Sequence, residues 1–404
     1  MAMVKEIWLL ILLLFLTVPY FAWKVANNFR TSALELYILI MMALIPVLSG
    51  MAALHEFEQP LIYGTLAQRN MLLGTLALMT IYAVRKNIIR IADIEKSLLV
   101  LSWGTLVLYV LMNTFLNPVD FLGDKGGMVG GGGISEASFK FRTEFVIFGF
   151  MYYALIGYRS RKIRPWLLAI PFILFLIFVV GGRSLLVSVF ASLLFFIWRW
   201  GTLSRHIVFV PKLLFFLMFS IVIMYATNAE YIGNLLDKFD SAITVVLTGD
   251  ETNDASANAR IIQTAIALPY IEKHWMMGNG DISNQWGGGY EGVLGGYFYP
   301  SDIGVFGVMY MYGLLGMLLF LAQFQFAFRY SKMIARYNIQ TPLIDATKGY
   351  LLYFAIHSLV TGRFAHYSEI SFFFVALLSC VVWENRNHRK SNSNMSNKVV
   401  SNVI

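Results

Sequence analysis

The sequence predicts an all-α protein that crosses a membrane many times. Hydrophobic residues make up 58% of the 404 residues, and charged residues make up only 13%. The mean hydropathy is +0.65. A soluble domain of this size could not keep so much apolar surface away from water, so the lipid bilayer must be the main solvent of this chain.

Apolar stretches predict about eleven transmembrane helices, because an α-helix needs about 20 apolar residues to cross the hydrocarbon core. The first stretch is not followed by a small-x-small cleavage site, so we expect a retained helix there and not a signal peptide. The stretches centre on residues 7–23, 33–53, 70–84, 97–116, 142–158, 165–180, 185–200, 208–227, 301–328, 347–362 and 368–384.

The basic residues predict the orientation of these helices. The net charge is +8, and in a membrane protein such an excess marks cytoplasmic loops, so we expect no nucleic-acid partner. The basic clusters fall on one side when about eleven helices are threaded between them. They contain Lys24/Arg30, Arg85/Lys86/Arg90/Lys96, Arg159/Arg161/Lys162/Arg164, Arg199/Arg205, Arg329/Lys332/Arg336/Lys348 and Arg386/Arg389/Lys390.

This threading divides the chain into four parts. Residues 1–227 form transmembrane helices with short loops, residues 228–300 form one large non-cytoplasmic loop, and residues 301–384 form the last helices. Residues 385–404 are rich in Asn, Ser and Lys and have no apolar face to bury, so we expect a disordered cytoplasmic tail. The single cysteine, Cys380, excludes a disulfide within the chain and a cysteine-based metal site.

Two glycine-rich segments interrupt the first part. Gly181-Gly182-Arg183-Ser184 separates two apolar runs and is too short for a loop, so we expect a tight hinge at the interface. The run at residues 126–133 lacks the Gly-Lys-Ser/Thr of a P-loop and the strand of a dinucleotide fingerprint, so we expect a flexible hinge.

Several charges are not explained by the orientation rule. Placing a charge at membrane depth costs at least ~2.5–3.5 kcal/mol, so such residues are candidates for function. The alternative is that each side chain extends to the lipid headgroups. These residues are Arg142, Arg183, Arg260 and Arg363.

The large loop has an acidic first half and a helical second half. The acidic stretch, residues 237–254, lacks an EF-hand spacing, so we expect a solvated loop. A helix is predicted from Ala257 onward, with Arg260, Gln263 and Thr264 on its wet face and apolar residues on the rest. This pattern is typical of a helix that lies at a membrane surface or under a lid.

Aromatic residues alternate with glycine after this helix. An aromatic belt at the membrane interface is one explanation. The other is a carbohydrate site, because the C–H faces of sugars stack on aromatic rings while Asn and Asp bind the hydroxyls. The candidates for glycan binding are Trp275, Trp286, Tyr290 and Tyr299.

A compact group of polar residues precedes the last helix. Arg363, His366 and Glu369 lie within seven residues at its predicted outer end. An arginine, a histidine and a carboxylate at this place suggest a site for a phosphate-bearing ligand, although a buried histidine is also a common packing residue.

The order of these features resembles the bacterial O-antigen polymerases of the Wzy type and their relatives, the O-antigen ligases. The matching features cover about half of the chain: many helices with one late periplasmic loop, Gly-Gly-Arg-Ser at a mid-chain turn, and three further motifs. These are Ala259-Arg260 with Pro269 and Met277-Gly278-Asn279-Gly280, then Ser301-Asp302-Ile303-Gly304, then Tyr312-Gly313-Leu314-Leu315-Gly316. Ligases carry a His-Asn pair where this chain has Tyr299-Pro300-Ser301-Asp302, which favours the polymerases.

The resemblance implies an inner-membrane glycosyltransferase on a GT-C-like scaffold, with its active site facing the periplasm. Donor and acceptor would both be undecaprenyl-diphosphate-linked oligosaccharides, and a chain-length regulator would be a plausible partner. Arg142, Arg183, Arg260 and Arg363 would bind the leaving diphosphate in place of a cation, so we expect no metal and no cofactor. Candidates for the general base are His366, Glu369 and Asp302, then His274 and Glu144.

Two alternatives stay open. The chain could be an O-antigen ligase or another polyprenyl-dependent glycosyltransferase. It could also be a transporter or lipid flippase, but no inverted repeat is apparent, and the polar residues gather on one face and not at the midplane.

Overall fold

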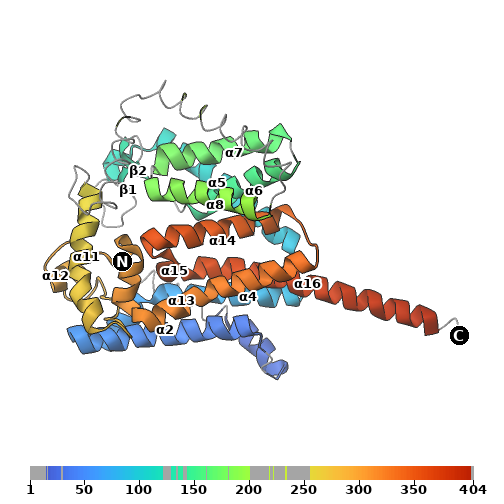
Figure 1. The fold of residues 1–404 in the computed structure, drawn as a ribbon, viewed down its shortest axis with the longest axis horizontal. Helices are drawn as coiled ribbons and strands as arrows, with labels where there is room; N and C mark the ends of the chain where they lie inside the picture. The colour runs from blue at the N-terminus through green and yellow to red at the C-terminus, as the bar shows by residue number, and fades with distance from the viewer. Residues whose placement is uncertain are drawn as a thin grey trace. The chain divides into compact units, whose positions relative to one another are not determined.

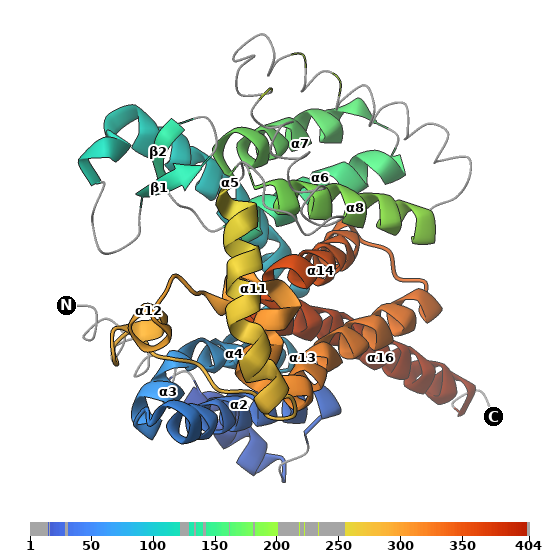
Figure 2. The same cartoon turned by 60° about the vertical axis from the view of Figure 1, so that its left-hand side comes forward.

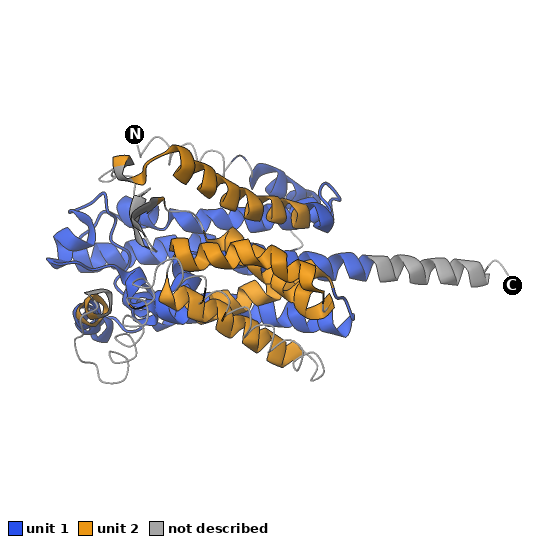
Figure 3. Ribbon diagram, turned by 90° about the horizontal axis from the view of Figure 1, so that it is seen from above, with its two compact units in different colours: residues 1–93, 263–340, 358–404 blue, residues 94–262, 341–357 orange. Residues whose placement is uncertain are grey.

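The computed structural model describes most of the chain (Figure 1). The described residues are 15, 17–28, 31–121, 129–132, 135–139, 143–160, 162–180, 182–200, 218, 222, 233 and 255–401. Predictions for the acidic stretch, for Arg142 and for the span at 208–227 therefore fall outside them, apart from single positions in that span. The chain divides into two compact units, which are described separately (Figure 3).

The first unit comprises residues 1–93, 263–340 and 358–404. In it α4 packs along α16, and α13 contacts both α16 and α2 (Figure 1). Figure 2 shows α3 beside α2, which it also contacts. Its elements are α2 (Ala33–Phe57), α3 (Leu61–Ala67), η1 (Arg69–Leu73), α4 (Gly74–Arg85), α12 (Gly289–Leu294), η4 (Pro300–Asp302), α13 (Gly304–Arg336), α15 (Arg363–His366) and α16 (Ser368–Ser401).

The second unit comprises residues 94–262 and 341–357. Its core forms where α6 packs against α7, and Gly149 and Gly157 allow Phe172 and Trp166 to approach the α6 backbone. Its elements are η2 (Pro118–Phe121), β1 (Val129–Gly132), β2 (Ser135–Phe139), α6 (Glu144–Ser160), α7 (Ile163–Phe175), η3 (Leu176–Val180) and α8 (Arg183–Trp200). Three helices run from one unit into the other: α5 (Ile91–Phe115), α11 (Ala255–Lys273) and α14 (Pro342–Thr361).

Six helices in the described part of the chain are long and apolar enough to cross a membrane. This confirms the helical membrane protein, but it does not support the predicted count of about eleven. The stretch at 70–84 is divided between η1 and α4, which has only 12 residues, and α6 has 17. The six spans are Ala33–Phe57, Ile91–Phe115, Ile163–Val180, Arg183–Trp200, Gly304–Arg336 and Ser368–Asn387.

The described part of the glycine-rich run, Val129–Gly132, is a strand and not the expected hinge. β1 pairs with β2 in an antiparallel hairpin, and Val129 lies opposite Phe139. Glycine weakens a strand but does not prevent pairing, and the short connection after Gly132 favours a hairpin. Among the described residues β1 and β2 are the only strands, and the other regular elements are helices.

The C-terminal segment also differs from the prediction. We expected a disordered tail from residue 385, but α16 continues to Ser401. The physical reason is that a packed helix supplies the nucleus, so each added turn requires only propagation, and residues 385–401 contain no Gly or Pro that would end it.

The helix expected from Ala257 is present as α11, but its faces are not those predicted. Gln263 is buried at 1% exposure, while Ile262 is 52% exposed. The side-chain oxygen of Gln263 accepts a hydrogen bond of 2.9 Å from the backbone N–H of Tyr299. Burying a side-chain amide costs little free energy when it has a hydrogen-bond partner. Gln263 can therefore lie inside while the apolar Ile262 lies outside. Arg260 is exposed, as expected.

Candidate functional site

Helix α13 is broken at Gly313, and a loop fills the break. Gly313 has φ 60° and ψ −169°, a backbone conformation that is not helical. Residues 274–281, here called the inserted loop, bond to the helix backbone on both sides of Gly313. The bonds run from Asn279 to Tyr310, from Gly280 to Met311, from Leu314 to Trp275 and from Leu315 to Met276, with N···O distances of 2.8, 2.9, 2.8 and 3.1 Å. The backbone groups that the break frees are therefore satisfied inside the protein, as a membrane requires.

Glycines make this close approach possible. Gly278 and Gly280 have φ of 73° and 80°, in the region that favours glycine. A Cβ at Gly278 would lie 2.5 Å from the backbone of Met311, and one at Gly280 would meet the backbone of Ser49 and Ala53 in α2. The Gly-Asn-Gly motif thus places the inserted loop between α2 and α13.

Asp281 follows this motif and is held by four groups. The Tyr290 hydroxyl donates to Oδ1 at 2.6 Å, and the Gln68 amide donates to Oδ2 at 2.7 Å. The backbone N–H of Asp281 donates to the Ser49 hydroxyl at 3.0 Å, and its carbonyl accepts from the Gln59 amide at 3.0 Å. Both the carboxylate and its backbone are therefore fixed in direction.

The electrostatics of Asp281 are unusual for an aspartate. Burial raises the pKa of Asp281 to about 6, although the hydrogen bond from Tyr290 and the positive charge of Arg69 both act to lower it. Burial and the Asp281 charge raise the pKa of Tyr290 well above its usual value, so Tyr290 stays a hydrogen-bond donor. A carboxylate with a pKa near 6 can exchange a proton close to neutral pH.

A second polar group lies where the start of α13 meets α15. A Cβ at Gly304 would lie 2.6 Å from the carbonyl oxygen of Leu359, and one at Gly362 would lie 2.8 Å from the carbonyl oxygen of Gly304. Both glycines have positive φ. The backbones of these two segments therefore touch, which brings the segments that carry Asp302 and Arg363 together.

His366 and Glu369 lie beside this junction. A Cβ at Gly362 would be 3.2 Å from Cδ2 of His366. Burial lowers the pKa of the His366 imidazole to about 4, and its Nε2 atom is buried with no hydrogen-bond partner among the described residues. Glu369 is 7% exposed. At neutral pH the histidine is therefore uncharged and is a weak base.

The short helix η1 joins the two polar groups. Gln68, directly before η1, contacts Asp281, and Met71 in η1 accepts a 3.4 Å hydrogen bond from Ser368 at the start of α16. Arg69, which lies between Gln68 and Met71 in the chain, is half-buried, and its positive charge acts on Asp281. Asp281, Arg69 and the α15–α16 turn therefore belong to one region of the first unit.

The predicted glycan-binding aromatics are not equivalent. Trp275 is 51% exposed and Tyr299 is 42% exposed, while Trp286 is half-buried. Tyr290 is only 6% exposed, and its hydroxyl bonds to Asp281. Three of the rings can thus meet a ligand, whereas the Tyr290 ring is covered in this conformation.

The other predicted arginines lie elsewhere. Arg183 begins α8 in the second unit, and two residues separate it from Val180, the last residue of the π-helical η3. Gly181 of the expected hinge lies outside the described residues, so its tightness stays a prediction, and π-helical turns are frequent at functional sites. Arg260 is on the α11 segment of the second unit, and Arg142 is outside the described residues.

Arg69, Gln59 and Gln68 were not among the residues predicted from the sequence, and no role was predicted for Asp281. Gln59 and Gln68 are buried at 0% and 5% exposure. Buried glutamines in a membrane protein were a usable signal, because a polar group without a partner is costly there. Their partner at position 281 is more than 200 residues away and could not be read from the pattern.

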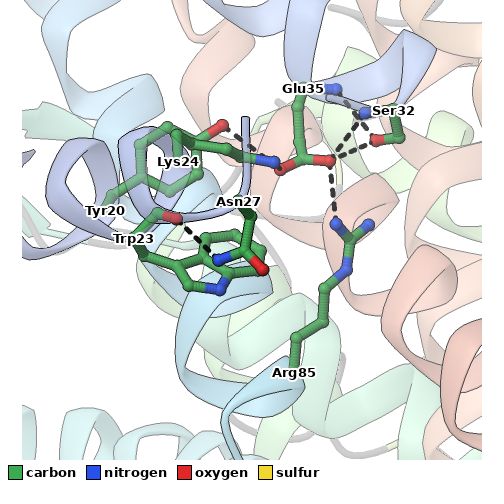
Figure 4. Close-up of polar contacts among 7 residues, drawn as sticks. All are labelled: Tyr20, Trp23, Lys24, Asn27, Ser32, Glu35 and Arg85. Atoms are coloured by element: carbon green, nitrogen blue, oxygen red, sulfur yellow. Dashed lines mark hydrogen bonds and ion pairs between the residues drawn. The ribbon is translucent and has the colours of Figure 1, made fainter. Parts of the chain in front are cut away.

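A buried ion cluster lies elsewhere in the same unit (Figure 4). Glu35, in the first turn of α2, is paired with Lys24 and with Arg85, the latter at 2.9 Å. The Ser32 hydroxyl and the Tyr20 hydroxyl donate to the same carboxylate, at 2.6 and 3.2 Å. Two of the predicted basic clusters therefore meet at one carboxylate, which agrees with their expected location on one side of the membrane.

Among the described residues no three His, Cys, Asp or Glu side chains are grouped so that they could hold a metal ion. The metal independence expected above stays a prediction. Comparison of the chain with models of protein families and with curated proteins finds no match.

Proposed function

We propose that the protein is a membrane glycosyltransferase that polymerises oligosaccharide repeat units, with a GT-C-like arrangement and an active site on the periplasmic face of the bacterial inner membrane. The donor is an undecaprenyl-diphosphate-linked oligosaccharide, and the acceptor is a second lipid-linked repeat unit. The observation that carries the proposal is the packing of Gly304 against Gly362, which brings the Asp302 and Arg363 segments together beside η1.

The charges of this region suit a diphosphate leaving group. Arg363 is half-buried at the start of α15, and Arg69 is half-buried in η1. A guanidinium binds two phosphate oxygens at once and keeps its charge in a poorly solvated place. As the bond from the sugar to the diphosphate breaks, such groups stabilise the growing negative charge.

The exposed aromatic rings suit the glycan part of the substrate. Trp275 lies in the inserted loop, and Tyr299 is fixed by its backbone bond to Gln263. The rings of Tyr297 and Tyr299 are 5.0 Å apart, so exposed aromatic surface is concentrated close to Asp302. Sugar rings stack on such surfaces, and fixed rings lose little entropy on binding.

A transporter is the second candidate, and one observation favours it. Discontinuous helices such as α13 are used by transporters to build binding sites near the midplane. In this protein, however, the freed backbone groups of α13 bond to the inserted loop, and so are not available to a substrate. A ligase or a related polyprenyl-dependent transferase would share the chemistry and differ in its acceptor.

The proposal is tested with the purified full-length protein in detergent. The substrate is a lipid-diphosphate-linked oligosaccharide repeat, and the products are separated on a gel. Wild type should give a ladder of polymers, and Arg363→Ala should lose at least about 100-fold in rate, the scale for loss of a group that stabilises transition-state charge. Arg363→Lys should recover only part of the rate, since lysine cannot bind two oxygens in the arginine geometry.

The matched control is Arg329→Ala, because Arg329 is exposed in the last part of α13. This variant should keep the wild-type rate. A single added unit on a different acceptor would identify a ligase, and movement of the lipid across vesicles without new glycosidic bonds would identify a transporter. Either result would overturn the polymerase proposal.

A further inference from the structure

Asp281 has the properties of a group that moves a proton and not of a group that only holds the fold. Its two carboxylate oxygens receive one hydrogen bond each, from Tyr290 and from Gln68, so a lone pair stays free on each oxygen. Three further hydrogen bonds hold the backbone around Asp281. Ser49 and Gln59 bond to the backbone of Asp281, and the side-chain amide of Asn279 donates to the backbone carbonyl of Tyr310. This is the rigid support that a reactive group requires.

We propose that Asp281 is the general base that accepts the proton of the acceptor hydroxyl. The inference rests on the proposed function and adds a catalytic residue to it. In the step, the acceptor oxygen forms a bond to the anomeric carbon of the donor. The bond between that carbon and the diphosphate oxygen breaks, the diphosphate leaves with the electron pair, and the hydroxyl proton moves to an Asp281 oxygen. Atoms and charge balance without any further reactant.

The surroundings favour Asp281 over His366 as the base. His366, with its pKa near 4, is a weaker base than a carboxylate with a pKa near 6, and a base works best when its pKa lies close to the working pH. Asp281 also lies in the loop that carries Trp275, and it is six residues from that exposed ring.

The charged and titratable groups that face Asp281 come from several elements. Arg69 of η1 lowers the pKa of Asp281, and Tyr290 of α12 lowers it through its hydrogen bond. Tyr310 and Tyr312 of α13 lie within electrostatic range of Asp281. Tyr312 donates to the Gln68 oxygen at 2.7 Å, which turns the Gln68 amide toward Asp281. Of these groups only Arg69 is charged at neutral pH.

The experiment measures the ladder rate of the purified protein as a function of pH. The wild-type rate should rise with pH through the range near 6 as Asp281 loses its proton. Asp281→Asn should reduce the rate at least about 100-fold, the scale of general base catalysis, and Asp281→Glu should recover part of it. Retained binding of the lipid-linked substrate would separate loss of chemistry from loss of the fold.

Tyr290→Phe separates a catalytic role of Asp281 from a structural one, because only the catalytic role predicts a change in the pH dependence of the rate. It removes the hydrogen bond that lowers the pKa of Asp281. The rising limb of the curve of rate against pH should therefore shift to higher pH. The matched control is Tyr63→Phe, on α3 of the same unit, which should leave the limb in place.

The outcomes are distinguishable. Full activity in Asp281→Asn, or an unmoved limb in Tyr290→Phe, would overturn the role of Asp281 while the wild-type ladder still supports the polymerase. A folded wild type that forms no ladder would instead overturn the proposed function, and the role of Asp281 would fall with it.

Discussion

The side-chain amide of Gln68 donates a 2.7 Å hydrogen bond to the carboxylate of Asp281, although 213 residues separate them. This bond connects the end of α3 to the inserted loop. It also bears on why a loop can lie among membrane helices, because the backbone bonds to α13 and the bonds to Asp281 give several of its polar groups partners inside the protein. The break in α13 and the carboxylate beside it are thus parts of one arrangement.

Substitution of Gly313 should destabilise the first unit. Gly313→Ala places a Cβ against the backbone of Met276 and Gly278 and forces a side chain into a positive-φ conformation. The backbone conformation alone costs roughly 1–3 kcal/mol, and the overlap adds to it. We expect a lower midpoint of thermal unfolding in detergent.

The control for this prediction is Gly104→Ala, in α5, where a Cβ would meet no atom within 4 Å. Alanine is favoured over glycine inside a helix by about 0.5–1 kcal/mol, so this variant should unfold at the same or a slightly higher temperature. Equal midpoints for Gly313→Ala and wild type would show that the break in α13 is not required.

Loss of the Glu35 charge should be strongly destabilising. Glu35→Gln leaves Lys24, which is 2% exposed, and Arg85 without their carboxylate. Removing one partner of a buried ion pair costs about 3–5 kcal/mol, because the remaining charge stays buried. Asp93→Asn is the matched control, since Asp93 is half-exposed beside an Arg90 that is 86% exposed, and it should cost less than about 1 kcal/mol.

Chemical denaturation of both variants measures this difference. Similar costs for the buried and the exposed carboxylate would contradict the cluster shown in Figure 4.

His366 should make stability depend on pH. Its pKa is lowered to about 4 in the folded protein, whereas that of an unfolded histidine is about 6.5. Between these values the unfolded chain binds the additional proton, so this contribution is complete above pH 6.5 and is lost as the pH falls toward 4. Unfolding measured from pH 7.5 to 4.5 should show a slope that His366→Gln reduces.

Asp281 should change stability with pH in the opposite direction to His366, so the two substitutions should change the slope of stability against pH with opposite signs. Its folded pKa of about 6 is above the unfolded value, so its contribution is complete below the unfolded pKa and is lost as the pH rises through 6. Asp281→Asn should therefore make the wild-type slope steeper. A slope that neither substitution changes would mean that both groups titrate alike in the folded and unfolded chains.

Local features of the fold could be predicted from the sequence. Hydropathy located the long spans at residues 33–53 and 185–200, which the structure has as Ala33–Phe57 and Arg183–Trp200. Among the described residues the predicted count of about eleven spans is not supported, in part because hydropathy cannot distinguish a span from the shorter buried helices α4 and α6, which also consist mostly of apolar residues.

The site could be predicted only in part, for a physical reason. Arg363, His366 and Asp302 could be chosen as candidates because they are polar residues in an apolar context, and that signal is local. The role of Asp281 depends on Gln59, Gln68 and Tyr290, and two of these are more than 200 residues away. The orientation of α11 was predicted wrongly for the same reason, because the partner of Gln263 is the backbone of Tyr299 and not solvent.

The measurement that tests the central claim most directly is the stoichiometry of diphosphate release. Purified wild type is incubated with the lipid-diphosphate-linked repeat, and the free lipid diphosphate and the new glycosidic bonds are both counted. Transfer from a diphosphate donor predicts one lipid diphosphate released for each bond formed, and neither product from Arg363→Ala. Release without bond formation, or no release from a folded wild type, would contradict the account.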